Sequence, residues 1–282
     1  MGEPLRPEAH IPFLLHQPPV AVAICASAAV AFAAWALKAL TVGGATSAFA
    51  VGCIVFGIGG PAFAIPLLVF LATGTILSRI GKANVCNAGK GPRRARQVWA
   101  NGGVAAALVV LFAAKAHEWP WYRSRELLML YLAALATVTA DTWSTEVGRL
   151  LGGVPRLLTS WRKVAPGVSG AVSTPGTLAG LVGAALIPAG VAFVWRLQPG
   201  EILVVVWAGF LGSMADSILG AGLQAQYAGE DDYAPRDGPA AAGQKPVHGF
   251  RPVTNDVVNL AASLAGAAMA WLLLATTHYP WG

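Results

Sequence analysis

Residues 201–223 read EILVVVWAGFLGSMADSILGAGL, and this run is apolar over almost its whole length. A helix needs about 20 such residues to cross the hydrocarbon core of a bilayer. After Glu201, the polar side chains of the run are Ser213, Asp216 and Ser217, whose spacings of three and four place them on one helix face. The run therefore predicts a transmembrane helix whose C-terminal end carries a polar face.

The rest of the chain repeats this pattern. Hydrophobic residues make up 56% of the 282 residues and charged residues 11%, whereas a soluble domain usually carries about 25% charged residues. The mean hydropathy is +0.60. Further apolar runs occupy 20–40, 43–58, 61–78, 98–116, 126 to beyond 139, 175–195 and 254–276. We expect an all-α, polytopic membrane helical bundle of about eight transmembrane helices, with a range of about six to eight because only Gly59, Gly60 and Pro61 separate two runs.

Lysine and arginine residues, which give a net charge of +6, gather in three loops: 79–97, 149–174 and 224–253. These loops follow the third, fifth and seventh runs and so share one side of the membrane, which the positive-inside rule makes cytoplasmic. We expect one multi-pass domain over 20–277 in the cytoplasmic membrane, with its active face cytoplasmic and with tails at 1–19 and 278–282. A basic loop is also explained as a topological signal alone, without any role in binding.

Acidic side chains fall at the helix ends on this predicted cytoplasmic side. Asp141 and Glu146 end the fifth run, Asp216 lies near the end of the seventh, and Asp256 opens the eighth. Ionisable groups inside a span are costly and are functional candidates by default. Mg²⁺ is bound in proteins by a few carboxylates together with phosphate oxygens and water, so these acids are the predicted metal ligands. Asp256 and Asn255 have a simpler alternative, because either residue suits the cap of the eighth helix.

Features that bind phosphate share that side. A basic strip runs from Lys82 to Arg96, and glycine-rich helix starts are expected at Asn101-Gly102-Gly103 and within 170–176. Backbone N–H groups at helix starts bind phosphate well. Acids, cations and such helix starts are together the parts of a phosphoryl-transfer site, where catalysis consists mainly of positioning and charge neutralisation. The sequence carries no HExxH, GxSxG or GxxxxGK[ST] motif.

Five motifs occur in this order: QVWANGG at 97–103, ADTWSTEVG at 140–148, GAVS at 170–173 followed by Gly176-Thr177, Gly212-Ser213 with Asp216-Ser217, and NDVVN at 255–259. Together they resemble an integral-membrane family that includes the chloroplast phytyl-phosphate kinase of vitamin E biosynthesis. The resemblance covers about residues 20–276. One position departs from the family pattern, since Ala171 stands where a second glycine is expected.

The resemblance implies an Mg²⁺-dependent kinase that phosphorylates an isoprenoid monophosphate to the diphosphate with CTP or another nucleoside triphosphate. Its partners are then that nucleotide, an isoprenoid phosphate lipid and the membrane, and no nucleic acid. Carried over by motif, the catalytic and metal-binding residues are Asp141, Glu146, Asp216 and Asp256. The residues expected to bind the nucleotide and phosphates, or to support them, are Arg79, Lys82, Lys90, Arg93, Arg94, Asn101, Ser173, Ser213, Ser217, Asn255 and Asn259.

Two other functions fit the same residues. A transporter of an anionic or lipid substrate predicts polar groups near the membrane midplane and broken helices, whereas the acids here lie near one face. A cytidylyltransferase of lipid phosphates shares the nucleotide and the metal with the kinase, but it releases pyrophosphate instead of CDP. The products therefore separate the two enzymes.

Overall fold

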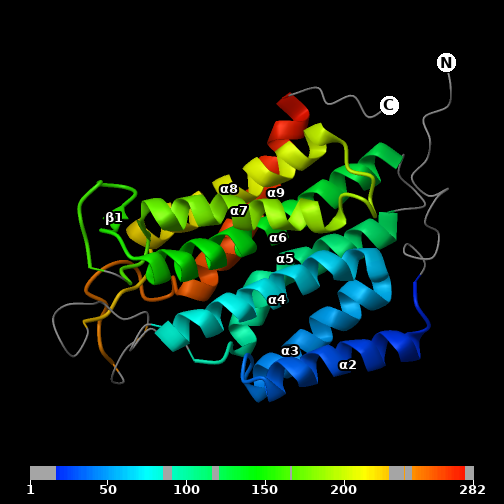
Figure 1. Ribbon diagram of the computed structural model, residues 1–282, viewed down its shortest axis with the longest axis horizontal. Coiled ribbons are helices and arrows are strands. Elements are labelled where there is room, and N and C mark those ends of the chain that lie inside the picture. The colour runs from blue at the N-terminus through cyan, green and yellow to red at the C-terminus, as the bar shows by residue number, and fades with distance from the viewer. Residues whose placement is uncertain are drawn as a thin grey trace.

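The structure, a computed structural model, consists almost entirely of helices (Figure 1). It describes residues 17–84, 91–115, 121–165, 167–228, 238 and 243–276. The helices, in chain order, are α2 (Val20–Ala36), α3 (Val42–Gly52), the π-helical turn η2 (Cys53–Ile58), α4 (Pro61–Asn84), α5 (Ala95–Lys115), α6 (Trp121–Leu151), α7 (Thr174–Val191), α8 (Pro199–Gly222) and α9 (Asn255–Thr276). Two short strands, β1 (Arg156–Leu157) and β2 (Ala171–Val172), pair antiparallel in the segment between α6 and α7.

The described helices match the predicted class of fold. Six of them, α4 to α9, are long and apolar enough to cross a membrane. The two shorter apolar segments, Val20–Ala36 and Val42–Ile58, pack against each other as α2 with α3 and η2. The prediction of a polytopic helical membrane bundle is confirmed. At the end drawn to the left in Figure 1, α4, α6 and α8 finish, α7 and α9 begin, and the longer connecting segments gather.

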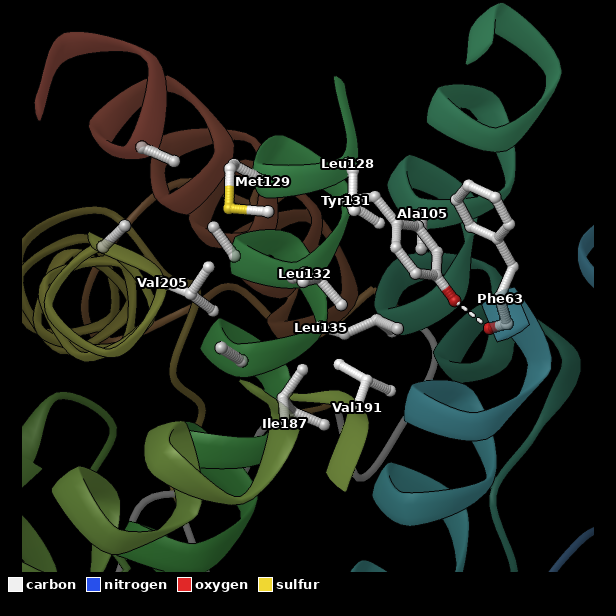
Figure 2. Packing of buried hydrophobic residues seen from close by; sticks show 14 of the residues in the cluster. Phe63, Ala105, Leu128, Met129, Tyr131, Leu132, Leu135, Ile187, Val191 and Val205 are labelled. Carbon is white, nitrogen blue, oxygen red and sulfur yellow. Dashed lines mark hydrogen bonds between the residues drawn. The ribbon is translucent and has the colours of Figure 1, made fainter. Parts of the chain in front are cut away.

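Helix α6 runs through the centre of the bundle and packs against α4, α5, α7, α8 and α9. Every residue from Tyr131 to Ala140 is buried. Figure 2 shows Leu132 and Leu135 of α6 pointing into the core that Ile187 of α7 also fills. With 31 residues, α6 is about 46 Å long, which exceeds the hydrocarbon thickness of about 30 Å. Its last turns therefore extend to the loop end of the bundle.

Small residues allow the neighbouring helices to approach α6 closely. A Cβ atom added to Gly212 of α8 or to Gly266 of α9 would overlap with the hydroxyl of Thr137. Gly209 of α8 faces Ala136 in the same manner. Close approach through small residues is a usual basis of helix association in membranes, because lipid tails leave no hydrophobic driving force between helices. The middle of α6 is thus held by direct backbone contact.

A buried ion pair fixes the end of the bundle away from these loops. Arg125 of α6 donates from Nε to Glu201 Oε1 at 2.6 Å and from Nη2 to Glu201 Oε2 at 2.7 Å. Arg125 Nη1 also donates to the Trp195 carbonyl at 2.9 Å, and the Gln198 N–H donates to Glu201 Oε2 at 2.7 Å. Both charges are thereby satisfied in a place where an unpaired charge is strongly destabilising. The pair sets the position of α6 relative to α8.

Helix α5 begins earlier than hydropathy predicts. It starts at Ala95, so Asn101-Gly102-Gly103 lies about two turns inside the helix. The N–H groups of this segment belong to the helical hydrogen-bond ladder, and the predicted helix start at Asn101 is wrong. The physical reason is that 95–97 favours helix but is too polar to count as a membrane span. The side chain of Gln97 also accepts the Arg94 N–H at 2.9 Å, which stabilises the earlier start.

The connecting segments differ from their predicted bounds as well. Helix α4 continues to Asn84, so the first basic loop is shorter than the predicted 79–97. The β1–β2 pair lies within 149–174. The two ends of 224–253 fold back on each other through bridges of Gln224 to Phe250 and of Gln226 to His248, and its middle lies outside the described residues.

We expect Gly212→Ala to reduce stability by about 1–3 kcal/mol, as overpacking of a tight contact does. Gly222 in the same helix has nothing within 4 Å of an added Cβ, so Gly222→Ala is the matched control and should leave stability unchanged. The measurement is the thermal unfolding of both purified variants in detergent. An equal loss in both variants would mean that contact with α6 does not set the stability.

Candidate functional site

A cavity of about 510 Å³ opens at the loop end of the bundle. Residues of α4, α5, α6, α8 and α9 line it, together with the turn after α2 and the segment around β2. Ten of the predicted site residues are among them: Arg79, Arg93, Asn101, Asp141, Glu146, Ser173, Asp216, Ser217, Asn255 and Asn259. Side chains that are up to 180 residues apart in the sequence thus face one space, which we call the charged cavity.

The acids of α6 follow directly on its buried part. Asp141 comes sixteen residues after Arg125, which is about 24 Å along the helix axis. Because Arg125 marks the opposite end of the bundle and a bilayer core is about 30 Å thick, Asp141 lies near the membrane boundary. Glu146 comes five residues further on and accepts a hydrogen bond from Ser78 of α4 at 3.0 Å. The third acid, Asp216, comes from α8 and is half-buried.

Two asparagines link three helices at the wall of this cavity. The side-chain amide of Asn259 on α9 lies 3.1 Å from Asn101 Oδ1 on α5. When the Asn259 amide is rotated so that its nitrogen and oxygen exchange places, the nitrogen donates to Asp216 Oδ2 at 3.0 Å and to the Asn255 carbonyl at 3.2 Å. That orientation satisfies the carboxylate. In that orientation Asn259 holds the Asp216 side chain in position, and its amide oxygen faces the Asn101 side chain.

Arg93 fastens the turn between α2 and α3 to the start of α5. Its N–H donates to the Ala39 carbonyl at 2.9 Å, and its carbonyl accepts from the Thr41 N–H at 3.1 Å. The guanidinium carbon lies 5.5 Å from the centre of the Phe70 ring on α4, a cation–π contact. Burial lowers the pKa of the Arg93 guanidinium, and the carboxylate of Glu146 opposes that shift. Since arginine keeps its proton in proteins, Arg93 supplies a fixed positive charge to the cavity wall.

The segment before α7 rests on the polar end of α8. Gly170 has φ +75°, and a Cβ atom there would overlap with the backbone of Ala221 and Ser217. The Ser169 hydroxyl donates to Gln224 Oε1 at 2.9 Å. Ala171, which replaces the expected second glycine, pairs with Leu157 as a strand residue, a conformation that alanine adopts without strain. Gly170 is thus the residue that lets this segment dock.

Helix termini contribute to the electrostatics of the cavity. The starts of α5, α7 and α9 supply Gln97, Ser173 and Asn255 to its wall, and helix N-termini carry partial positive charge that favours anions. Ser173 caps α7 by accepting the Gly176 N–H at 3.3 Å. The cap of α9 is Thr254, whose hydroxyl accepts the Val257 N–H at 3.4 Å, so the alternative that Asn255 or Asp256 caps this helix is wrong.

Several predicted site residues lie elsewhere. Ser213 is buried below Asp216, its carbonyl accepting from Ser217 at 3.4 Å. Asp256 is half-buried and Arg94 is exposed, and neither lines the charged cavity. The backbone of Lys82 belongs to α4, but its side chain and all of Lys90 lie outside the described residues.

Sequence reasoning missed other lining residues: Lys38, Ser78, Gln97, Thr142, Ser144, Thr145 and Arg149. Gln97 and the hydroxyls of 142–145 stand within the quoted motifs, which was the available signal. Lys38 and Ser78 end apolar runs, where a polar residue is ordinary and carries no distinct signal.

The acids suit a metal ion that is shared with phosphate. Within the part of the chain that the structure describes, no group of three His, Cys, Asp or Glu side chains is arranged to hold a metal by itself. Mg²⁺ is usually bound through one or two carboxylates, with substrate phosphates and water completing its shell. The half-buried carboxylates of Asp141 and Asp216 in one open cavity fit that mode of binding.

We expect Gly170→Ala to displace the β2 segment and to change the cavity. Gly152 is the matched control, because its φ of +71° is close to the +75° of Gly170 but nothing lies within 4 Å of an added Cβ. Both variants carry the strain of a left-handed alanine, about 1 kcal/mol, and Gly170→Ala should lose considerably more. Limited proteolysis of 152–173 and thermal unfolding measure the difference. Equal behaviour would contradict docking through Gly170.

Comparison with known proteins places the chain in a family. A family described as "Integral membrane protein DUF92" matches residues 25–267. An uncharacterized membrane protein of Synechocystis is 29% identical over 86% of this chain and 85% of its own length. Protein PGR of Arabidopsis thaliana is 31% identical over 72% of this chain and 78% of its own.

A further relative is the Arabidopsis thaliana protein VTE6, chloroplastic, which is 26% identical over 83% of this chain and 65% of its own length. No solved structure matches the chain. Because the matched residues span nearly all the described helices, the chain belongs to the DUF92 family of integral membrane proteins.

Proposed function

We propose that the protein is an Mg²⁺-dependent kinase that converts an isoprenoid monophosphate, of the phytyl or geranylgeranyl type, to its diphosphate with CTP or another nucleoside triphosphate. The observation that carries the proposal is the charged cavity itself. It combines Asp141, Glu146 and Asp216 with Arg79 and Arg93 at the membrane boundary. A lipid phosphate and a soluble nucleotide can meet at such a boundary, and the proposal agrees with the family resemblance of the five motifs.

The negative charges of two substrates must be neutralised before they approach. Arg93 is a fixed cation, and Arg79 is anchored by a hydrogen bond from Nη2 to the Leu37 carbonyl at 2.7 Å. Both side chains reach the same cavity from the α2–α4 side. We assign them to the phosphates, with the N-terminal ends of α7 and α9 as additional anion sites. This division leaves the acids on α6 and α8 for the metal.

Asp141 and Asp216 are assigned to Mg²⁺, which supplies charge neutralisation and alignment of phosphate oxygens when it is bound. Asn259 keeps the Asp216 carboxylate oriented when its amide nitrogen donates to Oδ2. Glu146 accepts a hydrogen bond from Ser78, and its negative charge favours the charged form of the Arg93 guanidinium. These residues position the reacting groups, which is the main task of a protein in phosphoryl transfer.

The reaction needs no strong base from the protein. An oxygen of the acceptor monophosphate, largely ionised near pH 7 because its second pKa is about 6, attacks the terminal phosphorus of the nucleotide. The bond from that phosphorus to the bridging oxygen breaks, and the nucleoside diphosphate leaves with the electron pair. The cavity has to align the two phosphates and exclude water as the competing acceptor.

The alternative of a transporter has less support. A transport path needs polar surface at the midplane, but α6 is buried from Tyr131 to Ala140. The hydroxyls of Thr137 and Thr139 in this stretch donate to backbone carbonyls of their own helix at 2.9 and 2.7 Å. A cytidylyltransferase would use the same charged cavity, and its product distinguishes it.

The membrane side is part of the proposal. Basic residues of 79–97 and 149–174 adjoin the charged cavity, and loops rich in lysine and arginine usually stay in the cytoplasm. We propose that the charged cavity opens to the cytoplasmic side of the cytoplasmic membrane, where nucleoside triphosphates are available.

We expect Asp141→Asn and Asp216→Asn each to lower kcat for phosphoryl transfer to phytyl phosphate by about 100-fold or more, the scale on which loss of one charge-stabilising group acts. The measurement is diphosphate formation by purified protein with CTP and Mg²⁺. Elution in size-exclusion chromatography and thermal unfolding check that both variants are folded. Full activity in either folded variant would contradict the assignment of that residue.

We expect Arg93→Gln to weaken nucleotide or acceptor binding, raising KM by about tenfold, since one charge-assisted contact to phosphate is lost. Arg96→Gln is the control, because Arg96 is exposed in the first turn of α5 and does not line the cavity. Steady-state kinetics with both substrates measure the effect. If the two variants behaved alike, the effect would come from general surface charge and not from Arg93.

A further inference from the structure

A second cavity, of about 410 Å³, lies among α2, α3, η2, α4 and α5. Its walls consist mainly of small and branched aliphatic side chains, including Ala26, Val30, Ala48, Val51, Ala64 and Leu68. We call this space the apolar groove. A space of this character within a membrane protein holds hydrocarbon, because an apolar lining offers water few partners.

The apolar groove meets the charged cavity. Arg93, Gln97 and Asn101 line both spaces. The lining changes from apolar to polar along helix α4. Residues from Pro61 to Leu71 line the groove, and Thr75, Ser78 and Arg79 line the charged cavity. One helical turn therefore separates an apolar wall from a charged one. A ligand that fills both spaces has an apolar tail and an anionic head.

The dimensions of the groove match a single tail. From Pro61 to Leu71 the wall advances ten residues along α4, which is about 15 Å and roughly half of a hydrocarbon core. At the end away from the charged cavity, the groove is bordered by Phe56 of the π-helical turn η2 and by Pro61. These two residues bound the space that a tail can occupy.

Arg93 stands at the junction of the two spaces. Its guanidinium lies 5.5 Å from the ring centre of Phe70, which itself lines the groove. The backbone bonds of Arg93 to Ala39 and Thr41 hold the α2–α3 turn, which completes the groove wall. The charge closest to the groove is thus fixed in place, and it suits the phosphate of a lipid whose tail lies below it.

We propose that the apolar groove binds the isoprenoid tail of the acceptor, with the acceptor phosphate at Arg93, Gln97 and Asn101. The assignment rests on the proposed function in taking the acceptor to be an isoprenoid phosphate. The tail lies between the α2–α3 hairpin and α4, and Phe56 and Pro61 limit its length. The head reaches the charged cavity, where the nucleotide enters from the loop side.

The test uses full-length protein in lipid nanodiscs and a geranylgeranyl monophosphate that carries a diazirine at the tail end. After photolysis, peptide mapping should find the label at the far end of the groove, within 48–56 and 61–65. Unlabelled geranylgeranyl phosphate should compete, whereas inorganic phosphate should not. A label placed only on the lipid-facing sides of α7 and α8 would overturn the proposal.

Bulky substitutions test the same point. Ala48→Phe and Ala64→Phe fill the groove from opposite walls and should reduce labelling at least tenfold. They should also raise KM for geranylgeranyl phosphate without changing KM for CTP or activity on dimethylallyl phosphate. Ala72→Phe is the control, because Ala72 is exposed on α4 and does not line the groove. Thermal unfolding verifies folding.

The two proposals can fail separately. Groove labelling without any phosphoryl transfer would overturn the kinase proposal and leave the tail site standing. Phosphoryl transfer that Ala48→Phe and Ala64→Phe do not affect, with labelling outside the groove, would overturn the tail site and leave the kinase standing.

Discussion

The burial of α6 on all sides is the constraint on which the rest of the structure depends. Its middle is surrounded by five other helices, and the Thr137 side chain packs tightly against Gly212 of α8 and Gly266 of α9. Within this core the hydroxyls of Thr137 and Thr139 donate to carbonyls of their own helix. Carboxylates are costly there, so on the loop side of the core they begin only with Asp141. The same packing that stabilises the bundle thereby fixes the position of two acids at one membrane boundary.

The remaining parts of the charged cavity come from helix ends. Helices α5, α7 and α9 begin there with N-termini that favour anions, the ends of α6 and α8 bring the carboxylates, and the end of α4 brings Arg79. Arg93 connects this arrangement to the α2–α3 hairpin and to the apolar groove. One arginine therefore borders both the charged cavity and the apolar groove, which is the combination that the proposed lipid phosphate requires.

The sequence predicted the helices and three acids that line the charged cavity, Asp141, Glu146 and Asp216, because hydropathy and the cost of buried charge act locally along the chain. The fourth predicted acid, Asp256, does not line it. It could not predict the start of α5 or the cap by Thr254, since hydropathy records burial in lipid and not helix ends. The roles of Arg93 and Asn259 depend on partners more than 50 and 150 residues away. The sequence could not predict the apolar groove either, because the residues of its walls resemble those of any other apolar helix face.

The central claim is transfer of the terminal phosphoryl group to a lipid phosphate at the charged cavity. The most direct measurement incubates purified protein with Mg²⁺, phytyl phosphate and CTP labelled with ³²P in either the α or the γ position. The proposal predicts that the γ label alone enters the lipid fraction as a diphosphate, with CDP as the other product. Entry of the α label with release of pyrophosphate, or no lipid labelling from either nucleotide, would contradict it.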